Sequence, residues 1–170
     1  MGAAGASPRD PFRLLFLCTG NSARSQMAEA ILNRKARGRI VAHSAGSRPA
    51  ARVNPLTIET LREYGIEWAG HAPRGVDLLG REPWDFVITV CDRAKESCPI
   101  FPGQPMLAHW GMPDPAEVQG DEAARRAAFR ETYLLLDRRI AFLLALPLER
   151  LERLALEARV QAIGAPEGGT

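Results

Sequence analysis

The sequence lacks long apolar runs and carries almost no excess of charge. No apolar segment approaches the roughly 20 residues that cross a bilayer, so we expect no membrane partner. The formal net charge at pH 7 is +2, which is too small to indicate nucleic acid as a partner. Residues 1–12 lack the apolar stretch of a secretory signal, and we expect them to be a disordered leader of a cytoplasmic protein.

Cysteine is also scarce, because the chain contains only Cys18, Cys91 and Cys98. An odd number of cysteines without an export signal argues against a disulfide framework and predicts free thiols in a reducing compartment. Zinc sites typically use pairs of cysteines with two to four residues between them, and the chain has no such pair. We therefore expect no metal site.

Short apolar segments alternate with segments of helical periodicity. The predicted strands are 13–18, 39–44, 84–92 and 105–112, and the predicted helices are 24–37, 55–64 and 117–146. This order is typical of an α/β domain with a parallel sheet. We predict a single domain at 13–146, with a four-stranded parallel sheet flanked by helices, then a C-terminal helix at 147–164 and a disordered tail at 165–170. The apolar face of that last helix is expected to consist of Leu148, Leu151, Leu154, Ala155 and Ala158.

Two of the cysteines lie at the ends of predicted strands. Cys18 ends the first strand and Cys91 ends the third. The carboxyl ends of parallel strands share one edge of the sheet, where ligands bind, so we expect both thiols at one candidate site. A cysteine at a strand end can equally be a buried core residue, but Cys98 lies in the polar segment "DRAKESCP", where that explanation is weaker.

The segment "CTGNSARS" connects the first predicted strand to the first predicted helix. It is either an inert turn with a buried cysteine or a cradle that presents a nucleophile to an oxyanion. Backbone amides of such a loop converge on the helix N-terminus, where an anion is stabilised, and Arg24 can clamp the anion with two hydrogen bonds. Its place between a clear strand and a clear helix favours the cradle.

The cradle interpretation gives each residue of this loop an expected role. The positive field is expected to lower the pKa of the Cys18 thiol, and Ser25 can donate a hydrogen bond to the thiolate. Gly20 and Asn21 occupy positions that tolerate unusual φ angles. The predicted oxyanion-binding residues are Thr19, Gly20, Asn21, Ser22, Ala23, Arg24 and Ser25.

The longer segment "CTGNSARSQMAE" resembles the phosphate-binding loop of the low-molecular-weight tyrosine phosphatase fold. More narrowly, it is similar to the thioredoxin-coupled arsenate reductases built on that fold, because Gln26 stands where the phosphatases usually have proline. The resemblance continues through "SAG", "VNP", "VITVCDRAKESCPIFPG" and "HWGMPDPA". It covers about residues 14–146, which leaves the last helix as an extension.

This resemblance implies a relay of three thiols that reduces arsenate to arsenite. Cys18 attacks arsenate, Cys91 attacks Cys18 and expels arsenite, and Cys98 then leaves a Cys91–Cys98 disulfide nearer the surface. The polar segment between Cys91 and Cys98 must open, and we expect this local unfolding to cost little free energy. No bound cofactor is expected, because an external thiol reductant (thioredoxin, glutaredoxin or another small thiol) recycles the disulfide. Phosphate and sulfate are the expected competing anions.

Asp114, in "MPDPAE", is implied to be the acid that protonates the leaving oxygen. It also fits an N-cap, with Pro115 at the first helical position, and the two roles are compatible. Some relatives bind potassium through positions matching Asn21, Glu29, Ser44 and an aspartate. Arg74 stands at the position of that aspartate, so we predict no dependence on potassium.

Two alternatives to an arsenate reductase remain. A phosphotyrosine phosphatase would need Cys18, Arg24 and Asp114, but would have no use for Cys91 and Cys98. A module that senses arsenite with three thiols would bind it tightly without turnover. The residues "AE" after "DP", where the phosphatases typically have tyrosines, favour a small inorganic anion over an aromatic ester.

Overall fold

The computed structural model describes residues 10–79, 81–150 and 153–165. Its sheet has four parallel strands in the order β2-β1-β3-β4. The strands are β1 (Phe12–Cys18), β2 (Ile40–Gly46), β3 (Phe86–Thr89) and β4 (Met106–His109). The prediction of a single α/β domain with a four-stranded parallel sheet is confirmed.

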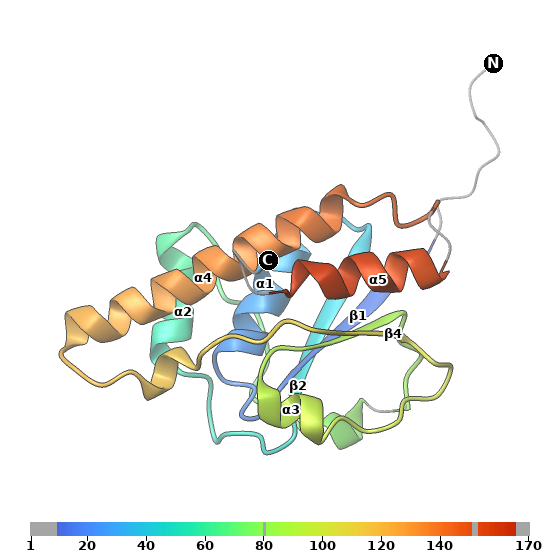
Figure 1. The fold of residues 1–170 in the computed structure, drawn as a ribbon. Helices are drawn as coiled ribbons and strands as arrows, with labels where there is room; N and C mark the ends of the chain where they lie inside the picture. The colour runs from blue at the N-terminus through green and yellow to red at the C-terminus, as the bar shows by residue number, and fades with distance from the viewer. Residues whose placement is uncertain (1–9, 80, 151–152, 166–170) are drawn as a thin grey trace.

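Helices cover both faces of this sheet. They are α1 (Arg24–Ala36), α2 (Pro55–Glu63), α3 (Asp92–Glu96), α4 (Glu122–Ala145) and α5 (Arg153–Ile163), with short 3₁₀ turns at Val76–Leu78 and Pro115–Glu117. Helices α1, α4 and α5 lie together on one side, and α3 lies on the other (Figure 1). Strand β1 runs through the middle of the core, where Leu14, Leu15 and Phe16 are fully buried. A strand covered on both faces is apolar at nearly every position, which is why the sequence shows no alternation there.

Helices α1 and α2 begin where predicted, whereas α4 and the C-terminal helix begin later, and strands β3 and β4 are shorter than the predicted 84–92 and 105–112. Helix α2 begins after Asn54, whose side chain accepts a hydrogen bond from the Leu56 amide at 2.9 Å. Helix α4 begins at Glu122, five residues later than predicted, because Asp121 caps it by accepting from the Ala124 amide at 2.8 Å. The segment between Cys91 and Cys98 also contains helix α3, which we did not predict.

The C-terminal extension forms a helix, but its start and its buried face differ from the prediction. Residues 148–150 form a turn and the described helix α5 begins at Arg153. Ala155 and Ala158 are exposed, whereas Leu156 and Val160 are buried against the domain. Leu148 is buried as predicted, so the predicted face is wrong at the two alanines, and nothing is described of the Leu154 side chain. Leu151 lies outside the described residues, as do residues 1–9 and 166–170 of the predicted leader and tail. Phe12, which we placed in the leader, instead begins β1 and is buried.

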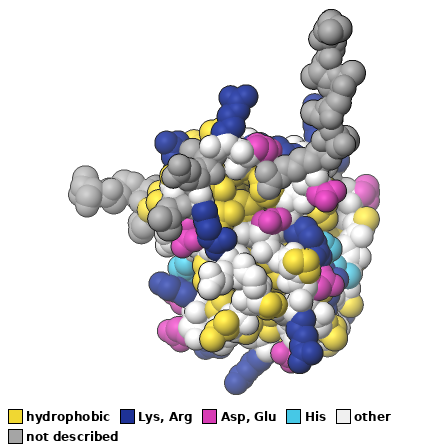
Figure 2. All heavy atoms as spheres, turned by 90° about the vertical axis from the view of Figure 1, so that its right-hand side faces the viewer, with side chains coloured by type: hydrophobic (Ala, Val, Ile, Leu, Met, Phe, Trp, Pro, Cys, Tyr) yellow, Lys and Arg dark blue, Asp and Glu magenta, His cyan; other side chains and the backbone are white. Residues whose placement is uncertain are grey.

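The surface has no dominant charge on the face seen in Figure 2. Lys and Arg side chains lie among Asp and Glu side chains there and do not form a continuous basic patch. No helix within the described ranges is long and apolar enough to cross a membrane.

Candidate active site

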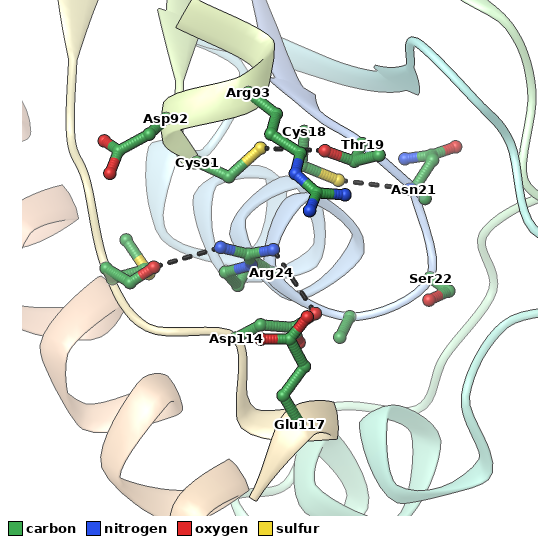
Figure 3. A pocket seen from close by; sticks show the side chains of 13 residues that line it. Cys18, Thr19, Asn21, Ser22, Arg24, Cys91, Asp92, Arg93, Asp114 and Glu117 are labelled. Atoms are coloured by element: carbon green, nitrogen blue, oxygen red, sulfur yellow. Dashed lines mark hydrogen bonds and ion pairs between the residues drawn. The ribbon is translucent and has the colours of Figure 1, made fainter.

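The carboxyl edge of the sheet brings Cys18 and Cys91 to one pocket. Cys18 ends β1, and Cys91 follows the neighbouring strand β3, where the Val90 amide donates to the Leu17 carbonyl at 2.8 Å. Both residues line a cavity of about 380 Å³ (Figure 3), which has room for a tetrahedral oxyanion. The remaining lining residues are Thr19, Gly20, Asn21, Ser22, Ala23, Arg24, Asp92, Arg93, Met112, Asp114 and Glu117.

The Cys18 sulfur is held by two hydrogen bonds from its own loop. The Asn21 amide donates to Sγ at 3.1 Å, and the Ser25 hydroxyl lies 2.8 Å from it. Asn21 Nδ2 donates to Ser25 Oγ at 2.8 Å. The Ser25 oxygen is therefore occupied as an acceptor, and its hydrogen is free to point at the sulfur. The predicted Ser25 contact is present in the structure.

Asn21 gives the loop its shape. Its φ angle is 52°, in the left-handed region that asparagine tolerates, and its side chain is fully buried. Besides Ser25, the amide group donates to Ser44 Oγ at 2.9 Å and accepts from the Arg74 backbone amide at 3.1 Å. Of the two loop residues that tolerate an unusual φ, Asn21 adopts a positive angle and Gly20 does not.

Gly46 allows the loop to lie against β2. It is the register partner of Cys18, and a Cβ at this position would lie only 2.4 Å from the Thr19 carbonyl oxygen. No side chain fits such a gap without moving the backbone of the loop. Gly46 ends the segment "SAG", and no local pattern in the sequence indicates this close approach.

The N-terminus of α1 faces the same pocket. Ala23 is the N-cap residue and supplies no side-chain hydrogen bond, so the first-turn amides remain available to an anion. Arg24 Nη1 donates to the Met112 carbonyl at 3.0 Å, and Nη2 lies 3.5 Å from Asp114 Oδ2. The segment after β4 thus positions the Arg24 guanidinium. Nothing in the sequence indicated that Met112 would take part in this contact.

Burial determines the acidity of the Cys18 thiol. Desolvation raises the pKa of Cys18 above its ordinary value. The hydrogen bonds from Ser25 and the Asn21 amide and the Arg24 charge act in the opposite direction, whereas Cys91 raises the pKa further. The prediction of a lowered pKa is therefore wrong for the protein in this structure. Cys18 is 3% exposed, and the loss of hydration outweighs the positive field.

Asp114 occupies the position predicted for it. Its Oδ1 accepts from the Ala116 amide at 2.9 Å, which caps the turn at Pro115–Glu117. Its other oxygen faces Arg24 across the pocket, as Figure 3 shows. The predicted cap is confirmed, and the carboxyl group lies within the lining of the pocket.

The third thiol lies outside this pocket. Cys91 caps α3, because its Sγ accepts from the Ala94 amide at 3.4 Å, and it also lies 3.3 Å from Thr19 Oγ1. Cys98 follows α3, half-buried, and borders a separate small cavity behind Cys18. Burial raises the pKa of the Cys98 thiol. The structure brings Cys18 and Cys91 together, whereas Cys98 must move to reach Cys91.

Arg74 contacts the residues that the resemblance associates with potassium. Its Nε donates to the Ser44 carbonyl at 3.0 Å, and its Nη2 lies 3.7 Å from Glu29 Oε1. A guanidinium group therefore supplies positive charge at this place. The part of the chain that the structure describes contains no cluster of three or more His, Cys, Asp and Glu side chains that could hold a metal ion.

Known proteins resemble this chain in sequence and in structure. An arsenate reductase from Oceanobacillus iheyensis is 37% identical over 118 residues, which cover 69% of this chain and 84% of that protein. Arsenate reductase 2 from Staphylococcus epidermidis is 39% identical over 116 residues, covering 68% and 88% respectively. A thioredoxin-dependent arsenate reductase from Corynebacterium glutamicum has a TM-score of 0.60 and 29% identity, over 81% of this chain and 62% of that one.

The family model for low molecular weight phosphotyrosine protein phosphatase matches residues 13–157. This range contains the sheet, the anion loop, both further cysteines and most of the described helices. The protein therefore belongs to the low molecular weight phosphotyrosine protein phosphatase family.

Proposed function

We propose that the protein reduces arsenate to arsenite through Cys18, Cys91 and Cys98. The observation that carries this proposal is that Cys18 and Cys91 line one anion pocket. A phosphatase needs only Cys18 there, together with Arg24 and an acid. The relatives that are named arsenate reductases support the same choice.

The first step forms a bond between Cys18 and arsenic. Arsenate enters as HAsO₄²⁻ and takes the proton that burial keeps on Cys18, which leaves a thiolate beside H₂AsO₄⁻. Arg24 and the free amides at the start of α1 bind the anion, and the Ser25 hydroxyl stabilises the thiolate. The thiolate attacks arsenic while Asp114 gives its proton to the leaving oxygen. The products are Cys18–S–AsO₃H⁻ and water.

The second step transfers two electrons to arsenic. The Cys91 thiol attacks the Cys18 sulfur, the S–As bond breaks, and its electron pair remains on arsenic. The products are a Cys18–Cys91 disulfide and H₂AsO₃⁻, which carries the proton of the Cys91 thiol. Thr19 Oγ1, at 3.3 Å from the Cys91 sulfur, lies where it can hold that sulfur next to the loop.

The third step moves the disulfide towards the surface. Cys98 attacks Cys91, which releases Cys18 as a thiol and leaves a Cys91–Cys98 disulfide. Helix α3 must open for this, because five helical residues separate the two cysteines. Its only buried residue is Ala94, and exposing one small side chain costs little. An external dithiol, for which thioredoxin is our candidate, then reduces the disulfide. Free thiols fit a reducing, cytoplasmic compartment.

The relay is tested by counting arsenite in a single turnover without external reductant. We expect about one arsenite per chain from the wild type and from Cys98→Ser, and none from Cys91→Ser. Steady-state NADPH oxidation with thioredoxin and its reductase is expected only in the wild type. Arsenite release by Cys91→Ser at the wild-type level contradicts the relay. Hydrolysis of a phosphate ester without any arsenite formation favours the phosphatase alternative.

A further inference from the structure

Arg93 places a second guanidinium group at the anion pocket. It is the second residue of α3, directly between the two downstream thiols in the chain, and its side chain lines the same cavity as Arg24. In Figure 3 its side chain extends from α3 in among the labelled side chains that line the pocket. Neither the composition nor the strand and helix pattern of the sequence singled it out.

The two arginines of this pocket differ in how their charge is used. Arg24 donates to the Met112 carbonyl and pairs with Asp114. For the Arg93 guanidinium, no hydrogen bond or ion pair is found among residues 10–79, 81–150 and 153–165. Arg93 is exposed, so it keeps its hydration until a ligand arrives. The charge of Arg93 is therefore available to a ligand, whereas the charge of Arg24 is partly compensated by Asp114.

The charges of the pocket lining favour a second cation beside Arg24. The lining contains two guanidinium groups, from Arg24 and Arg93, and three carboxyl groups, from Asp92, Asp114 and Glu117. With Asp114 protonated, as its role as the acid requires, and Asp92 turned away, Glu117 balances Arg24 and no net positive charge is left for a dianion. Asp92 is turned away, with its side chain 88% exposed and 3.0 Å from His109 Nε2. Two guanidinium groups match the two charges of HAsO₄²⁻ or HPO₄²⁻.

Arg93 also belongs to the segment that must move in the relay. Helix α3 has only five residues and is held at its start by the Cys91–Ala94 hydrogen bond and the Asp92–His109 contact. An additional charge-assisted hydrogen bond from Arg93 to a bound anion would be comparable in strength with these contacts. Such a bond would keep α3 closed while the anion is present.

We propose that Arg93 binds the oxyanion together with Arg24, and that this contact couples the occupied pocket to a closed α3. When arsenite leaves, the contact is lost and α3 is free to open, so that Cys98 reaches Cys91 only after product release. This order rests on the proposed arsenate reduction. Binding of the oxyanion itself does not, because phosphate fits the same cradle without any redox step.

The test uses inorganic phosphate and three full-length proteins: wild type, Arg93→Ala and Lys95→Ala. Lys95 lies on the same short helix, and its replacement by alanine removes the same charge. Lys95 lines a different cavity, beside Cys98. Phosphate affinity is measured by calorimetry, and amide hydrogen exchange of residues 92–98 is measured with and without phosphate. Melting temperatures verify that all three proteins are folded.

We expect Arg93→Ala to bind phosphate about tenfold more weakly, as for the loss of one partly exposed charge-assisted hydrogen bond. Phosphate is expected to slow exchange at 92–98 in the wild type and in Lys95→Ala, but not in Arg93→Ala at saturating phosphate. An affinity of Arg93→Ala within twofold of the wild type, or an equal loss in Lys95→Ala, overturns the assignment. Exchange that stays phosphate-protected in Arg93→Ala overturns the coupling. Failure of the wild type to form arsenite refutes the proposed function separately.

Discussion

Removal of the Ser25 hydroxyl is the sharpest test of how the loop activates Cys18. The hydroxyl lies 2.8 Å from the Cys18 sulfur inside a buried site. Its own oxygen accepts from Asn21, so its hydrogen stabilises the thiolate and lowers the pKa of Cys18 against the effect of burial. In Ser25→Ala this opposing contribution is lost, and the pKa of Cys18 rises further.

The size of the effect follows from the type of hydrogen bond. A hydrogen bond to a charged group contributes about 1.5–3 kcal/mol. At neutral pH the Cys18 thiolate population should therefore fall roughly 10- to 100-fold in Ser25→Ala. The rate of Cys18 alkylation should fall by the same factor and recover as the pH is raised. Single-turnover arsenite formation should follow it, since the thiolate is the nucleophile.

The assay is the pH dependence of iodoacetamide alkylation, in which mass spectrometry follows the Cys18 peptide. Ser47→Ala is the matched control, because this serine lies beside the loop and the structure gives its hydroxyl no hydrogen bond to the Cys18 sulfur. Its pH profile should coincide with that of the wild type. The reasoning is refuted if the Ser25→Ala profile also coincides with the wild type while the melting temperature shows an intact fold.

Three further predictions concern the acid Asp114, the close approach at Gly46 and the effect of potassium. Asp114→Asn should keep the cap on the Ala116 amide, because asparagine caps as well as aspartate, while the turnover number falls about 10²- to 10⁴-fold; turnover within tenfold of the wild type contradicts the acid role. Gly46→Ala should lower the free energy of unfolding by about 1–3 kcal/mol through overpacking against Thr19, as measured by urea titration. Gly75→Ala, where a Cβ meets nothing nearer than 3.7 Å, is its control, and equal stability of the two variants contradicts the close approach. Potassium and sodium salts at equal ionic strength should support equal activity, because Arg74 already supplies a cation beside Glu29 and Ser44; clearly higher activity in potassium refutes this.

The elements that the sequence predicted well have strong local signals. Asn54 and Pro55 define the start of α2 through a side-chain cap and a fixed φ, both of which act within a few residues. The start of α4 was wrong because Val118 extends the apolar pattern, whereas the cap at Asp121 decides the boundary. Helix α5 was misplaced for a related reason. Its buried face depends on which residues meet β4, and that contact is not local.

The candidate site also has features that local sequence signals predict and features that depend on contacts between distant segments. The apolar runs placed Cys18 at the end of β1 and Cys91 at the same edge, two residues beyond the end of β3, because parallel strands share their carboxyl edge whatever their exact register. The contacts of Arg24 with Met112, of Asn21 with Arg74 and of Gly46 with Thr19 join segments that are distant in the chain. No periodicity or motif spacing encodes such pairs.

The sequence by itself determined the order of the strands and of the longer helices, the anion loop and the three thiols, because these depend on local patterning and residue chemistry. Only the tertiary structure decided that the Cys18 thiol has a raised pKa, because desolvation depends on everything packed above the sulfur. The tertiary structure likewise placed Cys98 outside the pocket and Arg93 inside it. The direction of a side chain on a short helix depends on how that helix docks against the sheet, which the five residues of α3 do not specify.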